Sequence, residues 1–103
     1  GLSSDEYGLL ASTELVSSGV DLSLCLPSDE PTCLATVSLD ERKKASYEFL
    51  IEGTATFDFN AGWLPDFELH KPQALHIGTL ATIIEPGASA ILEWASGAAE
   101  RGL

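Results

Sequence analysis

Two runs of alternating apolar and polar residues, 32–39 and 45–52, flank a short charged stretch at 40–44. Successive side chains of a strand point to opposite faces, so a period of two predicts strands with one apolar face each. Two such runs joined by a short polar stretch predict an antiparallel hairpin. Its apolar face is expected to carry Ala35, Val37, Tyr47, Phe49 and Ile51.

This face allows two interpretations. It can pack on a core, which is the reading that periodicity alone favours. It can also form a small sheet that lies over a ligand or a partner sheet, with its aromatic rings packed against the ligand.

Helix signals stand near both ends of the sequence. Ser3-Ser4-Asp5-Glu6 has the form of a capping box, and Gly19 is typical of the residue that ends a helix. Further on, Glu85-Pro86 predicts the start of a second helix with proline at its first position, and Arg101-Gly102 predicts its end.

Further strands are predicted at residues 20–26, which alternate, at 56–59, and at 73–80. The last is more continuously apolar, as a parallel strand covered on both faces should be. Two prolines and two acidic residues predict a loop at 27–31, and glycine and proline among aromatic residues predict a loop or a short helical turn at 60–72. The last strand and helix would form the opening half of a βαβ unit, so the fold class is α/β.

The chain is acidic, with 16 Asp and Glu, 5 Lys and Arg, and a net charge of -11. This charge argues against nucleic acid or an anionic membrane as a partner. No apolar run reaches the roughly 20 residues of a membrane span. Cys25 and Cys33 fit no zinc pattern and are expected to be reduced, which predicts a cytoplasmic setting.

No self-contained catalytic or metal-binding motif is found. The sequence has no GxGxxG, GxxxxGK[ST] or GxSxG pattern. His70 and His76 lack the spacing of metal ligands, and we expect His70 to be exposed and His76 to lie in the core. We therefore name no catalytic residue and no metal ligand.

Six segments carry recognisable short motifs in a fixed order. They are residues 5–8 (DEYG), 18–21 (SGVD), 30–32 (EPT), 37–40 (VSLD), 47–55 (YEFLIEGTA) and 75–81 (LHIGTLA). Their order and spacing resemble the ribokinase-like PfkB family of carbohydrate kinases, and most closely its fructokinase-like members.

The resemblance implies a partial ribokinase-like fold, in which an antiparallel lid hairpin joins the start of a parallel βα core. Residues 1–26 would form a helix and strand of the core, residues 27–59 the lid hairpin, and residues 73–103 a strand and helix of the core. The chain would then be a single partial domain.

The resemblance also implies a function. The lid of this family covers the sugar, so Ala35, Phe49 and Ile51 would face the substrate, with Leu80 at the end of the re-entering strand. Relatives that bind acidic sugars have an arginine about where Ile51 stands, which favours a neutral hexose such as fructose. Members of this family also often form homodimers through paired lids.

ATP and Mg²⁺ belong to the full-length family, and this chain is expected to hold no cofactor itself. The family's N-terminal glycine and asparagine motif and its G-A-G-D motif, which supplies the catalytic aspartate and the anion hole, are both absent from the 103 residues. Two alternatives stay open. One is a non-catalytic binding or dimerisation module that uses the hairpin, and the other is an independent α/β domain of unrelated function.

Overall fold

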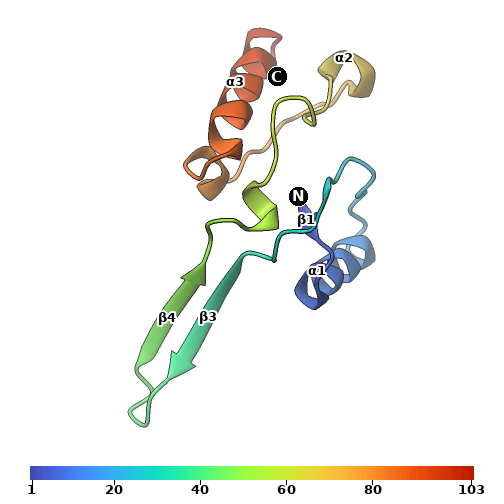
Figure 1. The fold of residues 1–103 in the computed structure, drawn as a ribbon. Helices are drawn as coiled ribbons and strands as arrows, with labels where there is room; N and C mark the ends of the chain where they lie inside the picture. The colour runs from blue at the N-terminus through green and yellow to red at the C-terminus, as the bar shows by residue number, and fades with distance from the viewer.

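The computed structural model describes residues 1–103 as a mixed α/β chain with three helices, a parallel pair of short strands and an antiparallel hairpin (Figure 1). The elements in order are β1 (Leu2–Ser3), α1 (Glu6–Ser17), β2 (Pro27–Ser28), β3 (Leu34–Leu39), β4 (Ala45–Leu50), α2 (Phe67–His70) and α3 (Gly87–Glu100). Single turns of 3₁₀-helix lie at Ala55–Phe57 (η1) and Leu80–Thr82 (η2). The mixed α/β character and the antiparallel hairpin are confirmed, but the half βαβ unit predicted at residues 73–103 is not formed, because its strand is absent.

The hairpin of β3 and β4 is confirmed within two residues at each end. Its loop closes through Asp40, whose Oδ1 accepts hydrogen bonds from the amides of Arg42 (2.9 Å) and Lys44 (2.8 Å). Lys43 has a positive φ of 60°. A turn followed by one left-handed residue is a common hairpin connection, and a short aspartate that bonds nearby amides favours it.

Helix α1 begins one residue after a cap that differs from the predicted one. Asp5, and not Ser3, is the N-cap, and its carboxylate accepts a hydrogen bond from the Gly8 amide at 2.8 Å. Ser3 pairs in β1 instead, and its hydroxyl accepts from the Asp5 amide at 3.1 Å. The helix ends as predicted before Gly19, which has φ = 81°.

Helix α3 also lies where the sequence predicts it. Pro86 stands directly before the first helical residue, one position earlier than expected. At the other end Gly102 has φ = 90°, and the Leu103 amide donates to the Ala98 carbonyl at 3.1 Å. This bond gives the Ala98 carbonyl a second donor beside the Arg101 amide, and it closes the last turn of the helix.

The predicted strand at residues 20–26 is wrong. Asp21 Oδ1 accepts a hydrogen bond from the Ser23 amide at 2.8 Å, so this segment turns on itself. Local bonds of this kind compete with a strand ladder. Pairing begins only at β2, which was predicted as loop and lies parallel to β1.

The predicted strands at 56–59 and 73–80 are also wrong. The first is largely the 3₁₀ turn η1, and the second forms no ladder before η2. A parallel strand needs a neighbour for its amides and carbonyls, and no strand of the chain pairs with residues 73–80. His76, predicted in the core, is therefore exposed, and His70 is exposed as expected.

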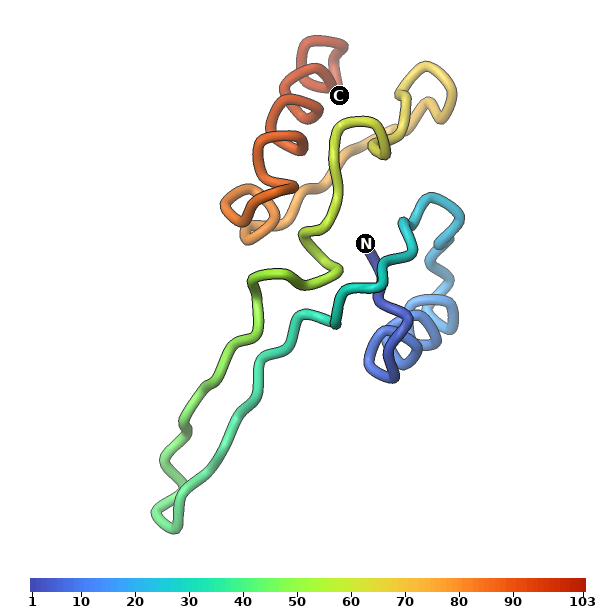
Figure 2. The backbone as a smooth tube through the Cα atoms, viewed as in Figure 1, coloured from blue at the N-terminus to red at the C-terminus, as the bar shows by residue number.

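The core is small and lies where the segment after the hairpin meets α2 and α3. Its buried apolar residues are Ala55, Phe57, Phe59, Phe67, Ala88 and Ala98. The radius of gyration is 15.9 Å, compared with about 13 Å for a compact domain of about 100 residues. Figures 1 and 2 show the reason, because the hairpin projects away from the rest of the chain.

Candidate binding face on the hairpin

One face of the hairpin is apolar along its whole length. Residues directly opposite each other in an antiparallel ladder point to the same side. The register therefore places three pairs on one face: Ala35–Phe49, Val37–Tyr47 and Leu39–Ala45. The other face carries Leu34–Leu50, Thr36–Glu48 and Ser38–Ser46. We call the first set of six residues the apolar hairpin face.

The apolar hairpin face is open to solvent. Its large side chains Val37, Leu39, Tyr47 and Phe49 are 53 to 67% exposed. The rings of Tyr47 and Phe49 lie nearly parallel, at 10°, with centroids 6.3 Å apart. Two exposed aromatic rings side by side form an apolar patch, which suits the C–H groups of a sugar or the apolar surface of another protein.

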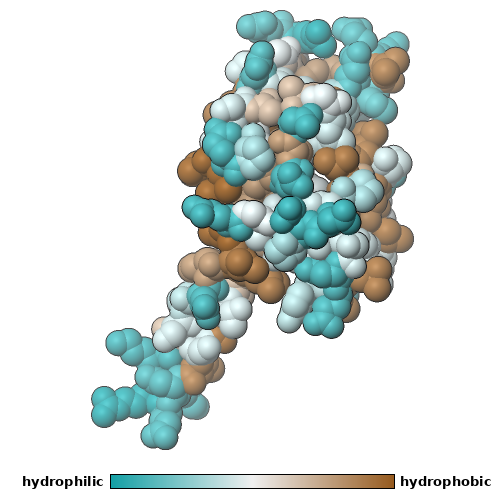
Figure 3. Space-filling view, in the orientation of Figure 1, coloured by the Kyte–Doolittle hydropathy of each residue, from teal (hydrophilic) through white to brown (hydrophobic).

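Charge is kept away from this face. Its only polar side-chain group is the Tyr47 hydroxyl, and the one charged residue within the two strands, Glu48, lies on the other face. The cations of the hairpin, residues 42–44, lie in the loop, where the surface is hydrophilic (Figure 3). The face therefore offers contact to neutral or apolar groups and offers no site for an anion.

The four residues predicted to face a substrate do not all lie together. Ala35 and Phe49 are direct partners in the ladder, and they share the apolar hairpin face. Ile51 lies one residue beyond β4 and is half-buried. Leu80 was predicted at the end of a strand, but it lies in the turn η2, which packs against α3, and it is exposed.

A carboxylate at the base of the hairpin was missed by the sequence analysis. Asp5 accepts hydrogen bonds from the hydroxyl and, at 2.8 Å, from the amide of Thr32. These bonds and the bond from the Gly8 amide lower the pKa of Asp5 to about 2. Asp5 and Thr32 both lie in segments that carry the family resemblance, 5–8 and 30–32. This shared resemblance is the signal from which a contact between them could have been predicted.

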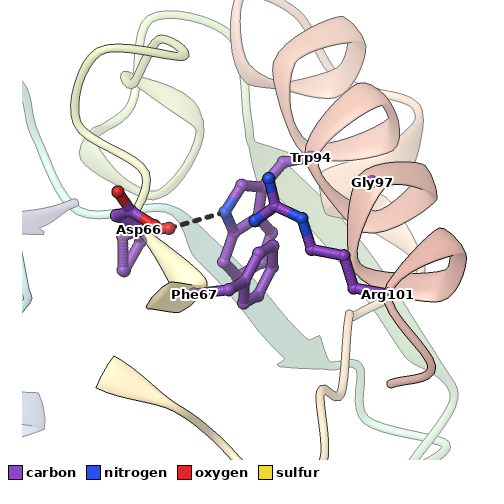
Figure 4. A pocket seen from close by; sticks show the side chains of 6 residues that line it. Asp66, Phe67, Trp94, Gly97 and Arg101 are labelled. Atoms are coloured by element: carbon purple, nitrogen blue, oxygen red, sulfur yellow. Dashed lines mark hydrogen bonds between the residues drawn. The ribbon is translucent and has the colours of Figure 1, made fainter. Parts of the chain in front are cut away.

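A separate hollow lies between the start of α2 and the second half of α3 (Figure 4). It has a volume of about 260 Å³ and is lined by Pro65, Asp66, Phe67, Trp94, Gly97 and Arg101. The rings of Phe67 and Trp94 stack with centroids 4.6 Å apart, and Trp94 Nε1 donates to the Pro65 carbonyl at 2.9 Å. These contacts hold the segment around α2 against α3, so packing accounts for both rings.

Other site chemistry is not assembled in the structure. No group of three or more His, Cys, Asp or Glu side chains is placed to hold a metal ion. Cys25 and Cys33 are free and half-buried. None of the helices combines the length and the apolar content that crossing a membrane would require. A comparison with protein-family models found no matching family, and a comparison with curated protein sequences found no match.

Proposed function

We propose that this chain is the lid-bearing segment of an ATP-dependent carbohydrate kinase of the ribokinase-like PfkB family, close to its fructokinase-like members. The observation that carries the proposal is the projecting hairpin with an exposed, uncharged face and two aligned rings. In this role the apolar hairpin face closes over a neutral hexose such as fructose. The finer fold we propose is the corresponding part of a ribokinase-like domain.

Phe49 is the side chain best suited to contact the sugar. Its ring is exposed and uncharged, and Ala35 opposite it is small, so the ring face is accessible from one side. Aromatic faces pack against the C–H groups of sugars. Ile51 would extend this apolar contact toward the base of the hairpin, and Leu80 would approach the sugar from the body.

The amount of exposed surface supports a segment that other protein covers. A compact monomer of this mass exposes about 5,600 Å², whereas this chain exposes 7624 Å². The excess of about 2,000 Å² is more than twice the roughly 800 Å² that one partner contributes to a standard interface. A single contact through the hairpin would therefore leave much of this surface uncovered.

Helix α1 contributes to the same surplus. Leu9, Leu10 and Val16 are 61 to 68% exposed, although they are large and apolar. Helices that are apolar around most of their circumference are typical of the buried layers of larger domains. The remaining strands of a kinase domain would cover such a helix.

The chemistry would come from outside these residues. Phosphoryl transfer depends on positioned donors, a base and metal-bound ATP, and the G-A-G-D motif is absent from the 103 residues. Within a whole kinase, ATP and Mg²⁺ would supply the phosphoryl group and its charge neutralisation. This chain's own part is to bind the sugar and exclude water. A cytoplasmic setting belongs to the same proposal.

The natural reading frame that encodes these residues tests the proposal. We expect it to encode a G-A-G-D motif after residue 103 and a sugar-binding glycine and asparagine motif before residue 1. A reading frame without the G-A-G-D motif would overturn the assignment to this family. It would leave a standalone module as the better account.

A second function, assembly with another copy, is favoured by the sheet itself. The hairpin is a two-stranded sheet, so both of its outer edges are unpaired, and its apolar face is uncovered. Exposed edges and faces of this kind are typical of strand addition and of two-fold dimers. We therefore propose a homodimer formed through the hairpin as the alternative role, within a kinase or without one.

A further inference from the structure

We infer that Asp5 is a positioning residue. Its carboxylate binds both the start of α1 and the entry to the hairpin, and these bonds fix the direction in which the hairpin leaves the body. The inference rests on the hydrogen bonds at the base of the hairpin. It does not depend on what the hairpin binds.

The hairpin has few other contacts that could orient it. Every residue of β3 and β4 is exposed except Leu34, which is half-buried. The two strands contact each other extensively, but neither packs against a helix of the body. Its orientation must therefore be set by the two connecting segments, residues 31–33 and 51–55.

The connection that follows β4 contains a glycine with a positive φ and then a buried, hydrogen-bonded threonine. Gly53 has φ = 66°, and a Cβ at this position would meet no atom within 4 Å. Thr54, the next residue, is buried, and its hydroxyl donates to the Ile51 carbonyl at 2.6 Å. The Ala55 amide then donates to the Pro31 carbonyl at 2.8 Å, which joins the two connections.

The incoming connection is held by Asp5 across 27 residues of sequence. Thr32, two residues before β3, donates both its hydroxyl and its amide to the carboxylate. The Gly8 amide donates to the same carboxylate, which places it at the start of α1. One side chain thus ties the first turn of a helix to the entry of the hairpin.

A small change in geometry at the Asp5–Thr32 hydrogen bonds produces a large displacement of the hairpin loop. A strand of six residues is about 20 Å long, so a small rotation about Thr32 moves the tip of the hairpin by several times the displacement at its base. The carboxylate is charged at neutral pH, as aspartates ordinarily are, and the donors from Thr32 and Gly8 favour this charged form by lowering its pKa to about 2. Hydrogen bonds to a charged acceptor are roughly twice as strong as neutral ones.

Asp5→Asn removes the hydrogen bond from the Thr32 amide and keeps the helix cap. Asparagine caps helices about as well as aspartate, so its one oxygen can still accept from the Gly8 amide. Its second terminal atom is a donor, which cannot accept from the Thr32 amide. The Thr32 hydroxyl shares Oδ1 with the Gly8 amide and can still donate to the remaining oxygen, so Thr32→Val is added to remove it. The double variant Asp5→Asn/Thr32→Val loses both bonds to Thr32. Asp21→Asn is the matched control, because Asp21 also accepts a backbone amide bond but lies in the turn after α1.

The experiment measures residual dipolar couplings of backbone amides in the 103-residue chain. In the wild type and in Asp21→Asn, one alignment tensor should fit residues 34–50 together with α1. In Asp5→Asn/Thr32→Val, residues 34–50 and α1 should require separate tensors, with the weaker alignment in the hairpin. Asp5→Asn and Thr32→Val alone should act in the same direction to a smaller extent, and Thr32→Ser should keep the single tensor of the wild type.

The outcomes decide the inference in each case. If one tensor fits the hairpin and α1 equally well in the double variant Asp5→Asn/Thr32→Val, Asp5 does not position the hairpin. If Asp5→Asn instead loses the amide signals of α1, the Thr32 variants carry the test, because they leave the bond from Gly8 in place. A shared tensor in Thr32→Val would then overturn the inference.

Discussion

Gly87 lies so close to the ring of Phe59 that a Cβ at this glycine would stand 2.5 Å from the ring carbons Cε1 and Cζ. Phe59 is buried and follows the hairpin, whereas Gly87 begins α3. This contact therefore joins the segment after the hairpin to the last helix. Gly87→Ala should lower the free energy of unfolding by roughly 1–3 kcal/mol, the usual cost of overpacking a core. Denaturant unfolding followed by circular dichroism measures it.

Gly97 in the same helix is the control for this prediction. A Cβ there would meet no atom within 4 Å. Gly97→Ala should therefore raise the free energy of unfolding by about 0.5–1 kcal/mol, because alanine is the better helix former. Equal effects at the two glycines would show that the contact with Phe59 does not decide the packing of α3.

The stability contributed by Asp5 should depend on pH in one direction. Its pKa falls from 3.8 to about 2 on folding, chiefly through the bonds from Thr32. A group whose pKa is lowered stabilises the folded chain above its unfolded pKa, and this contribution is lost as the pH falls through the folded pKa. The difference in unfolding midpoint between the wild type and Asp5→Asn should be constant above about pH 5 and shrink toward pH 2. A difference that does not change over this range would contradict the hydrogen bonds described at Asp5.

Lys43 should be replaceable by glycine with a gain in stability. Its φ of 60° is left-handed, and a residue with a Cβ adopts this conformation at a cost. Lys43→Gly should raise the hydrogen-exchange protection factors of the hairpin amides about fivefold, which corresponds to roughly 1 kcal/mol. Lys44→Gly is the control, because Lys44 has no positive φ and its substitution should not protect. Loss of protection in Lys43→Gly would contradict the turn.

Assembly through the hairpin predicts a concentration-dependent molecular mass. Tyr47→Glu places a charge on the apolar hairpin face and should raise the dissociation constant of a dimer by at least about tenfold. Ser38→Glu places the same charge on the other face, opposite the uncharged Ser46, and should have little effect. Analytical ultracentrifugation distinguishes these results. A wild-type chain that stays monomeric at every concentration would remove dimerisation as its role.

The elements that the sequence predicted correctly have local causes. The hairpin is defined by its period of two and by Asp40, whose bonds all lie within five residues. The helix ends at Gly19 and Gly102 follow from the positive φ that glycine tolerates. The pairing of Ala35 with Phe49 could also be predicted, because the loop fixes the register of the strands.

The elements that it predicted wrongly depend on partners. Residues 73–80 have the composition of a parallel strand, but such a strand forms only beside another, and none pairs with it here. Leu80 accordingly lies in η2 and not at the end of a strand. The cap at Asp5 was missed because Ser3 and Asp5 are both good caps, and the choice depends on the long-range bonds to Thr32.

Sugar phosphorylation by the complete natural protein that contains these residues tests the central claim most directly. With ATP and Mg²⁺ it should phosphorylate fructose or another neutral hexose, and Phe49→Ala should raise the KM for the sugar roughly fivefold to tenfold with little change in kcat. Leu50→Ala, one residue away on the opposite face, should leave the KM unchanged. The 103-residue chain alone should show no turnover. A complete protein that phosphorylates no sugar, or turnover by the isolated chain, would contradict the account.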